Sequence, residues 1–172
     1  MVNRNRNLWL RLPDPELLAQ CEQQRFRASG PGGQHRNKVE TGVRLIHRPS
    51  GITAQAAESR STEGNRKVAL HRLRMRLALE MRDPLEGLPE EFVRQGLSVN
   101  PHNPVYPIIV ATALDALGEV AGSYAQAAKT LGVTTTQLRK FLESDREVWR
   151  SVTEGRSPLP QGEGTTVTGG AG

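Results

Sequence analysis

Two short stretches in the first half of the chain alternate between apolar and polar residues, with the period of two that a β-strand has. A Pro-Ser-Gly turn at residues 49–51 separates the two stretches, so the pattern predicts a β-hairpin. The apolar side of this hairpin is expected to face a core. The residues on that side are Val43, Leu45 and His47 in the first strand and Ile52, Ala54 and Ala56 in the second.

After the hairpin the spacing of apolar residues changes to three and four, which is typical of an α-helix that packs one face on a core. Ser61 or Thr62 can cap the start of this helix. Asp83 precedes Pro84 and therefore resists the helical conformation, which closes the helix there. The apolar stripe expected to pack on the hairpin consists of Leu70, Leu73, Leu77 and Met81.

A shorter helix is predicted ahead of the hairpin. Asp14 is a suitable N-cap and Pro15 suits the first helical position, so we expect a helix from Pro15 to about Gln23. Cys21 would lie on this helix as a small buried or half-buried residue, because no His and Asn partners for a nucleophile are apparent. It is the only cysteine, which excludes an intramolecular disulfide.

The second half of the chain is predicted to be helical. Pro107 can open a helix that extends to about Glu119. Residues 123–142 have the pattern of helix, glycine turn and helix, which looks like a helix-turn-helix motif. Whether this motif contacts RNA, docks on a protein or is only structural stays open, because its second helix offers only Arg139 and Lys140 as cations. Its small core is expected to contain Ala127, Leu131, Val133 and Leu138.

Together these elements predict an α+β fold. A β-hairpin or small sheet packs on a long helix, and a small all-α domain with a helix-turn-helix-like motif follows. A Pro-, Gly- and acid-rich stretch separates the two units, and the Gly-, Thr- and Pro-rich end of the chain is expected to be a disordered tail. The predicted boundaries are an N-terminal arm at 1–14, a first domain at 15–83, a linker at 84–104, a helical domain at 105–150 and a tail at 151–172.

Charge is distributed unevenly along the 172 residues. Residues 25–82 contain 13 Arg and Lys against 4 Asp and Glu, whereas residues 83–172 contain 7 against 11. A basic segment such as residues 25–82 is typical of a protein that binds a phosphate backbone. The alternative is a basic surface that is only solvated. No apolar run reaches the roughly 18 to 20 residues of a membrane span, and residues 1–12 lack the apolar core of a signal peptide. We expect a cytoplasmic protein.

The most specific chemistry lies in a loop within the basic segment. Its sequence is Gly30-Pro31-Gly32-Gly33-Gln34-His35-Arg36-Asn37-Lys38. Because glycine has no Cβ, Gly32 and Gly33 can bring the Gln34 amide N–H close to a ligand. The spacings of a P-loop and of a dinucleotide-binding loop are both absent, and ordinary turn chemistry is the simpler alternative.

The flanks of this loop decide between these interpretations. Over about residues 15 to 82, the sequence resembles the peptidyl-tRNA hydrolysing (Gly-Gly-Gln, or GGQ) domain of class I peptide chain release factors. The segments that carry the resemblance are Arg27 to Lys38, Gly42 to Ile52, Arg60-Ser61 and Asn65 to Leu70.

The resemblance implies that the loop enters the peptidyl transferase centre of the ribosome and promotes attack of water on the peptidyl-tRNA ester. Gly32, Gly33 and Gln34 would be the catalytic residues. The main-chain N–H of Gln34 would stabilise the developing negative oxygen or the leaving 3′-hydroxyl, and its side chain would position water. No acid, base, metal or cofactor is required from the chain, and His35 is expected to pack locally or contact RNA.

The resemblance also implies partners. These are the ribosome, through large-subunit RNA and peptidyl-tRNA, and a glutamine methyltransferase that acts on Gln34. We expect a monomer that does not act at a membrane. Arg36 departs from the small apolar residue common in the family and adds charge. The residues expected to bind RNA are Arg25, Arg27, Arg36, Asn37, Lys38, Arg66 and Lys67.

Codon independence is a further expectation. Full-length release factors have a stop-codon-reading domain, and the 24 residues before Arg25 are too few to form one. The segment Ser29 to Gln34, with Arg60-Ser61 and Asn65 to Lys67, is especially similar to codon-independent mitochondrial members that rescue stalled ribosomes. Two alternatives are kept: a non-catalytic RNA- or DNA-binding regulator that uses residues 123–142, and a ribosome-assembly or docking protein with a vestigial loop.

Overall fold

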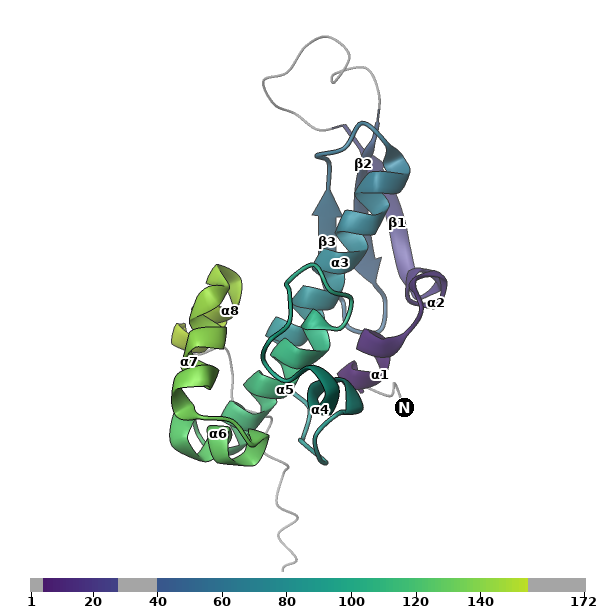
Figure 1. Ribbon diagram of the computed structural model, residues 1–172. Helices are drawn as coiled ribbons and strands as arrows, with labels where there is room; N and C mark the ends of the chain where they lie inside the picture. Colours follow the sequence, from purple (N-terminus) through teal and green to yellow (C-terminus); the bar gives the residue numbers. More distant parts are fainter. Residues whose placement is uncertain (1–4, 28–39, 155–172) are drawn as a thin grey trace, which may run out of the picture.

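The computed structural model describes residues 5–27 and 40–154, and within them the chain forms three strands and eight helices (Figure 1). The elements are α1 (Arg6–Arg11), α2 (Asp14–Ala19), β1 (Cys21–Phe26), β2 (Gly42–His47), β3 (Thr53–Ala56), α3 (Thr62–Glu80), α4 (Glu90–Gln95), α5 (Tyr106–Glu119), α6 (Tyr124–Leu131), α7 (Thr135–Ser144) and α8 (Arg146–Thr153).

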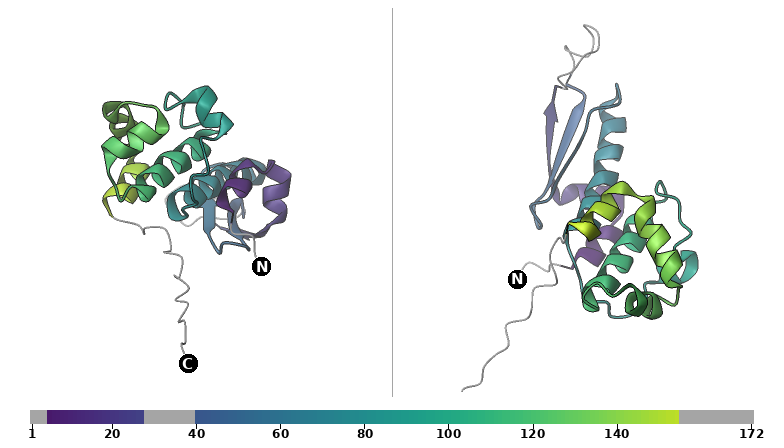
Figure 2. Two further views of the ribbon diagram at one scale, coloured as in Figure 1. Left: turned by 90° about the horizontal axis from the view of Figure 1, so that it is seen from below. Right: turned by 90° about the vertical axis from the view of Figure 1, so that its left-hand side faces the viewer.

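The three strands form one antiparallel sheet in the order β1-β2-β3, and α3 lies along one face of it (Figures 1 and 2). Val43 pairs with Ala56 across the predicted hairpin, and both side chains are buried on the face that α3 covers. The α+β architecture, with a small sheet packed on a long helix and helices after it, is confirmed. Along its other edge, β2 pairs with β1, and the sequence pattern did not indicate this third strand.

The long helix α3 begins and packs as its sequence predicts. Ser61 is the N-cap, and its hydroxyl accepts a hydrogen bond from the main-chain N–H of Gly64. The helix ends at Glu80, and Met81 follows it as a half-buried cap residue. The first three residues of the predicted stripe, Leu70, Leu73 and Leu77, are buried in the core.

The helix predicted from Pro15 to Gln23 is wrong in its second half. Helix α2 ends at Ala19, and Cys21 is the first residue of β1 rather than a helical residue. Pairing of β1 with the central strand imposes the extended conformation, because tertiary contacts override weak local preferences. Cys21 is buried, as expected, and burial raises the pKa of its thiol to about 11, so it stays protonated near neutral pH.

The helix-turn-helix predicted at residues 123–142 is confirmed. Helix α5 is buried along most of its length, and α6 and α7 meet at Gly132, which has the left-handed φ of +68° that glycine favours. Of the predicted core, Ala127, Leu131 and Leu138 are buried, and Val133 is half-buried against them. Helix α8 was not predicted.

Two segments contain more structure than the sequence indicated. The expected linker at 84–104 contains α4, whose Phe92 side chain is only 3% exposed. The expected N-terminal arm contains α1, whose Trp9 and Leu10 side chains are buried in the same apolar cluster. Whether 15–83 and 105–150 are separate folding domains stays a prediction. The tail expected at 151–172 begins too early, because α8 extends to Thr153, and its residues from 155 onward lie outside the described residues.

A buried ionic cluster joins the two halves of the molecule. The Arg6 guanidinium, on α1, is fully buried and donates to the carboxylate of Asp115, on α5. Arg6 also lies 3.8 Å from the Asp83 carboxylate, just beyond α3. Desolvation by burial raises the pKa of the Asp115 carboxyl group, and the positive charge of Arg6 lowers it. Desolvation is the larger effect, so the pKa is raised to about 6. The cluster therefore fastens α1 to both α3 and α5.

The molecule is extended, with its two ends formed by different elements. The ends of β1 and β2 that flank residues 28–39 lie far from the helical unit, with α4 and α6 at the opposite end (Figure 1). None of the described helices is long and apolar enough to span a membrane.

Candidate functional site

The strands β1 and β2 form the stem from which residues 28–39 project. Phe26 and Gly42 are the last paired residues, so the two points where the loop attaches lie side by side. The predicted catalytic residues Gly32, Gly33 and Gln34, and the predicted RNA contacts Arg36, Asn37 and Lys38, lie outside the described residues. The structure therefore defines the support of the loop, and the roles of these six residues stay predictions.

The end of the stem is closely packed around Gly42. A Cβ atom on Gly42 would lie 2.8 Å from both the Phe26 ring and the Phe26 carbonyl oxygen, a distance that side chains essentially never adopt. On the same side of the sheet, the Arg44 guanidinium lies 5.6 Å from the centre of the Phe26 ring, which is a cation–π contact. Glycine is required here because the two strands approach so closely, and not because of an unusual φ angle.

Asn65 connects the stem to the start of α3. Its fully buried amide group donates to the carbonyl of Thr41 at 2.7 Å and to the carbonyl of Ser59 at 2.9 Å. Its side-chain oxygen accepts from the main-chain N–H of Ser59 at 2.8 Å. One side chain thus fixes the residue before β2, the segment before α3 and the first turn of α3 relative to one another.

Four of the predicted RNA-binding residues are described, and the elements that contain or adjoin them, the end of β1 and the start of α3, lie at the loop end of the molecule (Figure 1). Arg25 is exposed on β1, and Arg27, just after β1, lies 3.3 Å from the Glu40 carboxylate. Arg66, in the first turns of α3, is bonded to Glu63 at 2.8 Å, while its neighbour Lys67 is exposed. Both ion pairs are on the surface, where salt screens them, so all four cations are available to phosphates.

Comparison with known proteins identifies this part of the chain. Residues 18–91 match the model of the RF-1 domain. The RF-1 domain match and the similar proteins reported below support membership of the class I peptide chain release factor family. The match includes β1, β2, β3 and α3, together with the loop between β1 and β2, and it ends within α4.

Release factors of bacteria are similar to part of this chain. Peptide chain release factor 2 of Acidovorax sp. (strain JS42) is 53% identical over 62 residues, which is 36% of this chain and 17% of that protein. Peptide chain release factor 1 of Verminephrobacter eiseniae (strain EF01-2) is 44% identical over 72 residues, which is 42% of this chain and 20% of that protein. This chain thus spans a fifth or less of these relatives. No solved structure matches it.

Within the RF-1 domain, the residues that support the stem are not evident from the sequence pattern. Asn65 belongs to a segment that carries the family resemblance, but its role depends on contacts with Thr41 and Ser59 that sequence alone does not give. A signal was present nonetheless. Asn65 lies inside a helix that Ser61 already caps, where an asparagine is unfavourable unless its side chain has a specific partner.

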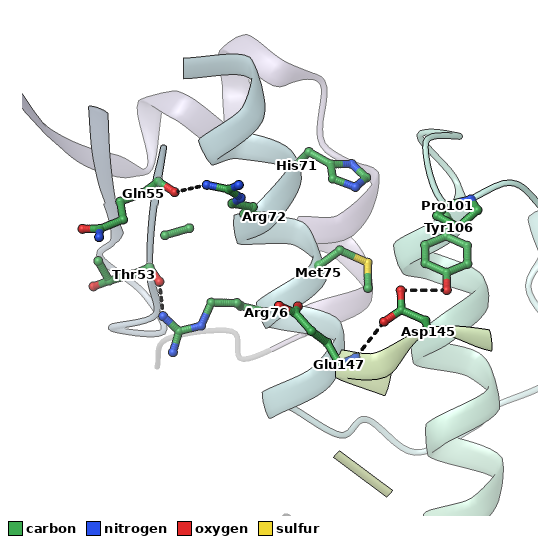
Figure 3. A pocket seen from close by; sticks show the side chains of 11 residues that line it. Thr53, Gln55, His71, Arg72, Met75, Arg76, Pro101, Tyr106, Asp145 and Glu147 are labelled. Atoms are coloured by element: carbon green, nitrogen blue, oxygen red, sulfur yellow. Dashed lines mark hydrogen bonds between the residues drawn. The ribbon is translucent and has the colours of Figure 1, made fainter. Parts of the chain in front are cut away.

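A groove of about 490 Å³ separates the RF-1 domain from α5 and α8 (Figure 3). Arginines from α3 cross one wall of the groove to the outer edge of β3, and a tyrosine–aspartate pair forms part of the other wall (Figure 3). The arginine bonds contribute to holding β3 on α3. The pairs are Arg72 with the Gln55 carbonyl at 2.8 Å, Arg76 with the Thr53 carbonyl, and the Tyr106 hydroxyl with Asp145 at 3.1 Å.

The histidine in the RF-1 domain core has a structural role. His47 is buried, and its two ring nitrogens lie 2.7 Å from the Ser50 hydroxyl and 3.1 Å from the Gln20 side-chain oxygen. Burial lowers its pKa, so the ring is neutral at physiological pH. Across the described residues, no group of three or more His, Cys, Asp and Glu side chains is arranged to hold a metal ion.

Proposed function

We propose that this chain is a codon-independent release factor that promotes hydrolysis of the peptidyl-tRNA ester on stalled ribosomes or separated large subunits. The observation that carries the proposal is the RF-1 domain match, because the matched residues 18–91 include the Gly-Gly-Gln loop. The names of the similar proteins, peptide chain release factors 1 and 2, support a role in the release of completed or stalled chains.

The proposed chemistry needs one preorganised donor. The main-chain N–H of Gln34 stabilises the negative oxygen or the leaving 3′-hydroxyl, and the Gln34 side chain positions water against the ester. Gly32 and Gly33 allow the backbone to approach the substrate. Such a mechanism is sensitive to position, since a misplacement of about 1 Å can cost on the order of a hundredfold in rate. The hydrogen bonds of Asn65 to Thr41 and Ser59 tie the β2 side of the stem to the start of α3, which supports the base of the loop.

The proposed partners are large-subunit RNA and peptidyl-tRNA. Arg25 and Arg27 at the end of β1, and Arg66 and Lys67 at the start of α3, would contact RNA phosphates, as would the loop residues Arg36, Asn37 and Lys38. A further proposed partner is a glutamine methyltransferase that modifies the side-chain nitrogen of Gln34. The protein acts as a monomer in cytoplasmic translation.

Codon independence is the finer part of the proposal. It is supported by the likeness of Ser29 to Gln34, with Arg60-Ser61 and Asn65 to Lys67, to codon-independent members of the family. In this account the RF-1 domain alone provides the chemistry, and no base of an mRNA codon is needed to trigger it.

Peptide release from defined ribosomes tests the proposal. Ribosomes that carry labelled peptidyl-tRNA would be prepared with an empty A site, a sense codon or a stop codon, and the full chain added at several concentrations. We expect release in which a stop codon gives no advantage over the empty A site. Release that requires a stop codon would contradict codon independence, and no release from any complex, including isolated large subunits, would contradict the hydrolase role.

A further inference from the structure

The helix-turn-helix has a local charge opposite to that of the surrounding chain. Residues 83–172 are net acidic, but residues 120–142 contain no Asp or Glu and contain Lys129, Arg139 and Lys140. Arg139 is bonded to Glu143 at 2.7 Å, whereas in the described part of the chain neither lysine has a carboxylate within ion-pair distance. The motif therefore presents two uncompensated positive charges.

These charges and a set of exposed hydroxyl and amide groups lie on α6, on α7 and in the turn between them, and we call these exposed residues together the α6–α7 face. Thr134 and Gln137 form a reciprocal capping box, in which each side chain accepts from the main-chain N–H of the other residue. The Thr134 hydroxyl hydrogen and the Gln137 side-chain N–H groups thus stay available as donors. Thr136 and Lys140 are four residues apart and so share one stripe of α7. The face comprises the exposed residues Lys129, Thr134, Thr135, Thr136, Gln137 and Lys140.

The composition of this face disfavours a protein partner. Binding surfaces for proteins are anchored by large apolar or aromatic residues. In the described part of the chain, the exposed large hydrophobic residues are Leu8, Val68, Leu88 and Val93, and all lie outside α6 and α7. Hydroxyl groups, amides and lysines are instead the side chains that contact phosphate and sugar groups.

We propose that the α6–α7 face docks the protein on double-stranded RNA by contacting its sugar–phosphate backbone. The choice of RNA rests on the proposed function, which places the chain on the ribosome. The major groove of an RNA duplex is too deep and narrow for side chains to reach the bases. The face therefore supplies affinity and orientation through phosphates, without sequence preference, at a distance from the loop end of the RF-1 domain (Figure 1).

A binding experiment with the full chain tests this inference. The probes are a labelled RNA hairpin and a DNA hairpin with the same stem sequence, titrated over a series of KCl concentrations. The variant Lys129→Glu with Lys140→Glu should bind the RNA hairpin at least about tenfold more weakly, with a salt slope smaller by about 2, because two phosphate contacts are lost. The control, Arg94→Glu with Arg146→Glu, makes the same charge change at exposed positions outside the face and should bind within about twofold of the wild type.

Several results would overturn the inference. They are unchanged RNA affinity in the lysine variant, an equal loss in the control, or tighter binding of the DNA hairpin through the same lysines. Thermal unfolding of both variants checks that they are folded, which is expected because all four side chains are exposed.

Peptide release separates this inference from the proposed function. The lysine variant should need about tenfold more protein for half-maximal release and should reach the same maximal rate. A wild type that releases peptide, with RNA binding unaffected by the lysine substitutions, would contradict only the docking role. A wild type that binds RNA through this face but never releases peptide would contradict only the proposed function.

Discussion

The loop stem and the helix-turn-helix are stabilised in different ways. In the stem, Asn65 reaches the main chain of Thr41, 24 residues away, and Gly42 packs against Phe26 across the sheet. In the helix-turn-helix, the side-chain bonds are local caps such as Thr134 with Gln137, and the core is small and apolar. The stem must hold a loop at a fixed position, and long-range polar contacts provide that constraint. Local caps and apolar packing are enough for the docking role that we propose for the helix-turn-helix.

The largest effect is expected at the buried ionic cluster that joins the two halves of the molecule. Replacing Arg6 with Ala would leave the buried Asp115 carboxylate without its partner, and we expect a loss of about 3 to 5 kcal/mol in the free energy of unfolding near pH 7.5. Chemical denaturation of the variant and of an Arg11→Ala control, whose ion pair with Glu91 is only partly buried, measures the difference. Similar losses in both variants would show that the buried cluster does not join the halves.

The same variant has a predictable pH dependence. In the wild type the pKa of Asp115 is already raised, to about 6 from the 3.8 of an unburied group. Removing Arg6 raises this pKa further, because the charge that favours the carboxylate is lost. A raised folded-state pKa gives stability that is present at low pH and is lost as the pH rises through that pKa. The deficit of Arg6→Ala should therefore be smaller at pH 5 than at pH 8, and an equal deficit would contradict the account.

The next effect tests the polar support of the stem. Asn65→Ala removes three buried hydrogen bonds and leaves main-chain groups of Thr41 and Ser59 unpaired, which should cost about 3 kcal/mol. Peptide release should fall more than ribosome binding does, since the loop loses its fixed base. Gln55→Ala removes an exposed amide bonded to Arg44 and serves as the control, with little expected change. If Asn65→Ala changes neither the free energy of unfolding nor peptide release, the stem does not depend on long-range polar contacts, and it does not differ from the helix-turn-helix in this respect.

A smaller effect is expected from the two glycines near the stem. Gly42→Ala should cost about 1 to 3 kcal/mol, because its Cβ would meet a main-chain carbonyl 2.8 Å away. Gly64→Ala meets the Ser59 hydroxyl at 2.8 Å, which is a side-chain atom that can rotate away at the cost of its bond with the Ser61 N–H, so we expect a smaller loss than for Gly42→Ala. Thermal unfolding of the two variants measures this difference, and equal losses would argue against the close approach of the strands at Gly42.

The smallest effect sharpens the functional contrast. Ser61→Ala and Thr134→Ala each remove one N-cap, so each should cost about 1 kcal/mol. Only Ser61 lies beside the segment that Asn65 holds, so peptide release at saturating factor should fall for Ser61→Ala and not for Thr134→Ala. Equal release by both variants would mean that the start of α3 does not position the loop.

The same contrast explains what the sequence could predict. The elements β2, β3, α3, α5, α6 and α7 were predicted because periodicity, caps and the glycine turn are local signals. Strand β1 was missed because its residues, Cys21 to Phe26, have little intrinsic strand preference and are extended only through pairing with β2. The bond between Arg6 and Asp115 joins residues 109 apart, which no local pattern can indicate.

The candidate site shows a similar division. The Gly-Gly-Gln loop and its basic flanks were recognised from their residues, and the RF-1 domain match supports the family. The supporting roles of Asn65 and Gly42 depend on the three-dimensional arrangement of the stem, so they required the structure. The roles of Gly32, Gly33 and Gln34 stay predictions.

The most direct test of the central claim compares the wild type with Gly33→Ala on the same ribosomes. Labelled peptide released from complexes with an empty A site would be measured at saturating factor, and binding to the same complexes would be measured in parallel. We predict that the wild type releases the peptide and that Gly33→Ala binds normally but releases on the order of a hundredfold more slowly, as expected when a preorganised donor is displaced. Equal release by the two proteins, or no release by the wild type, would contradict the account.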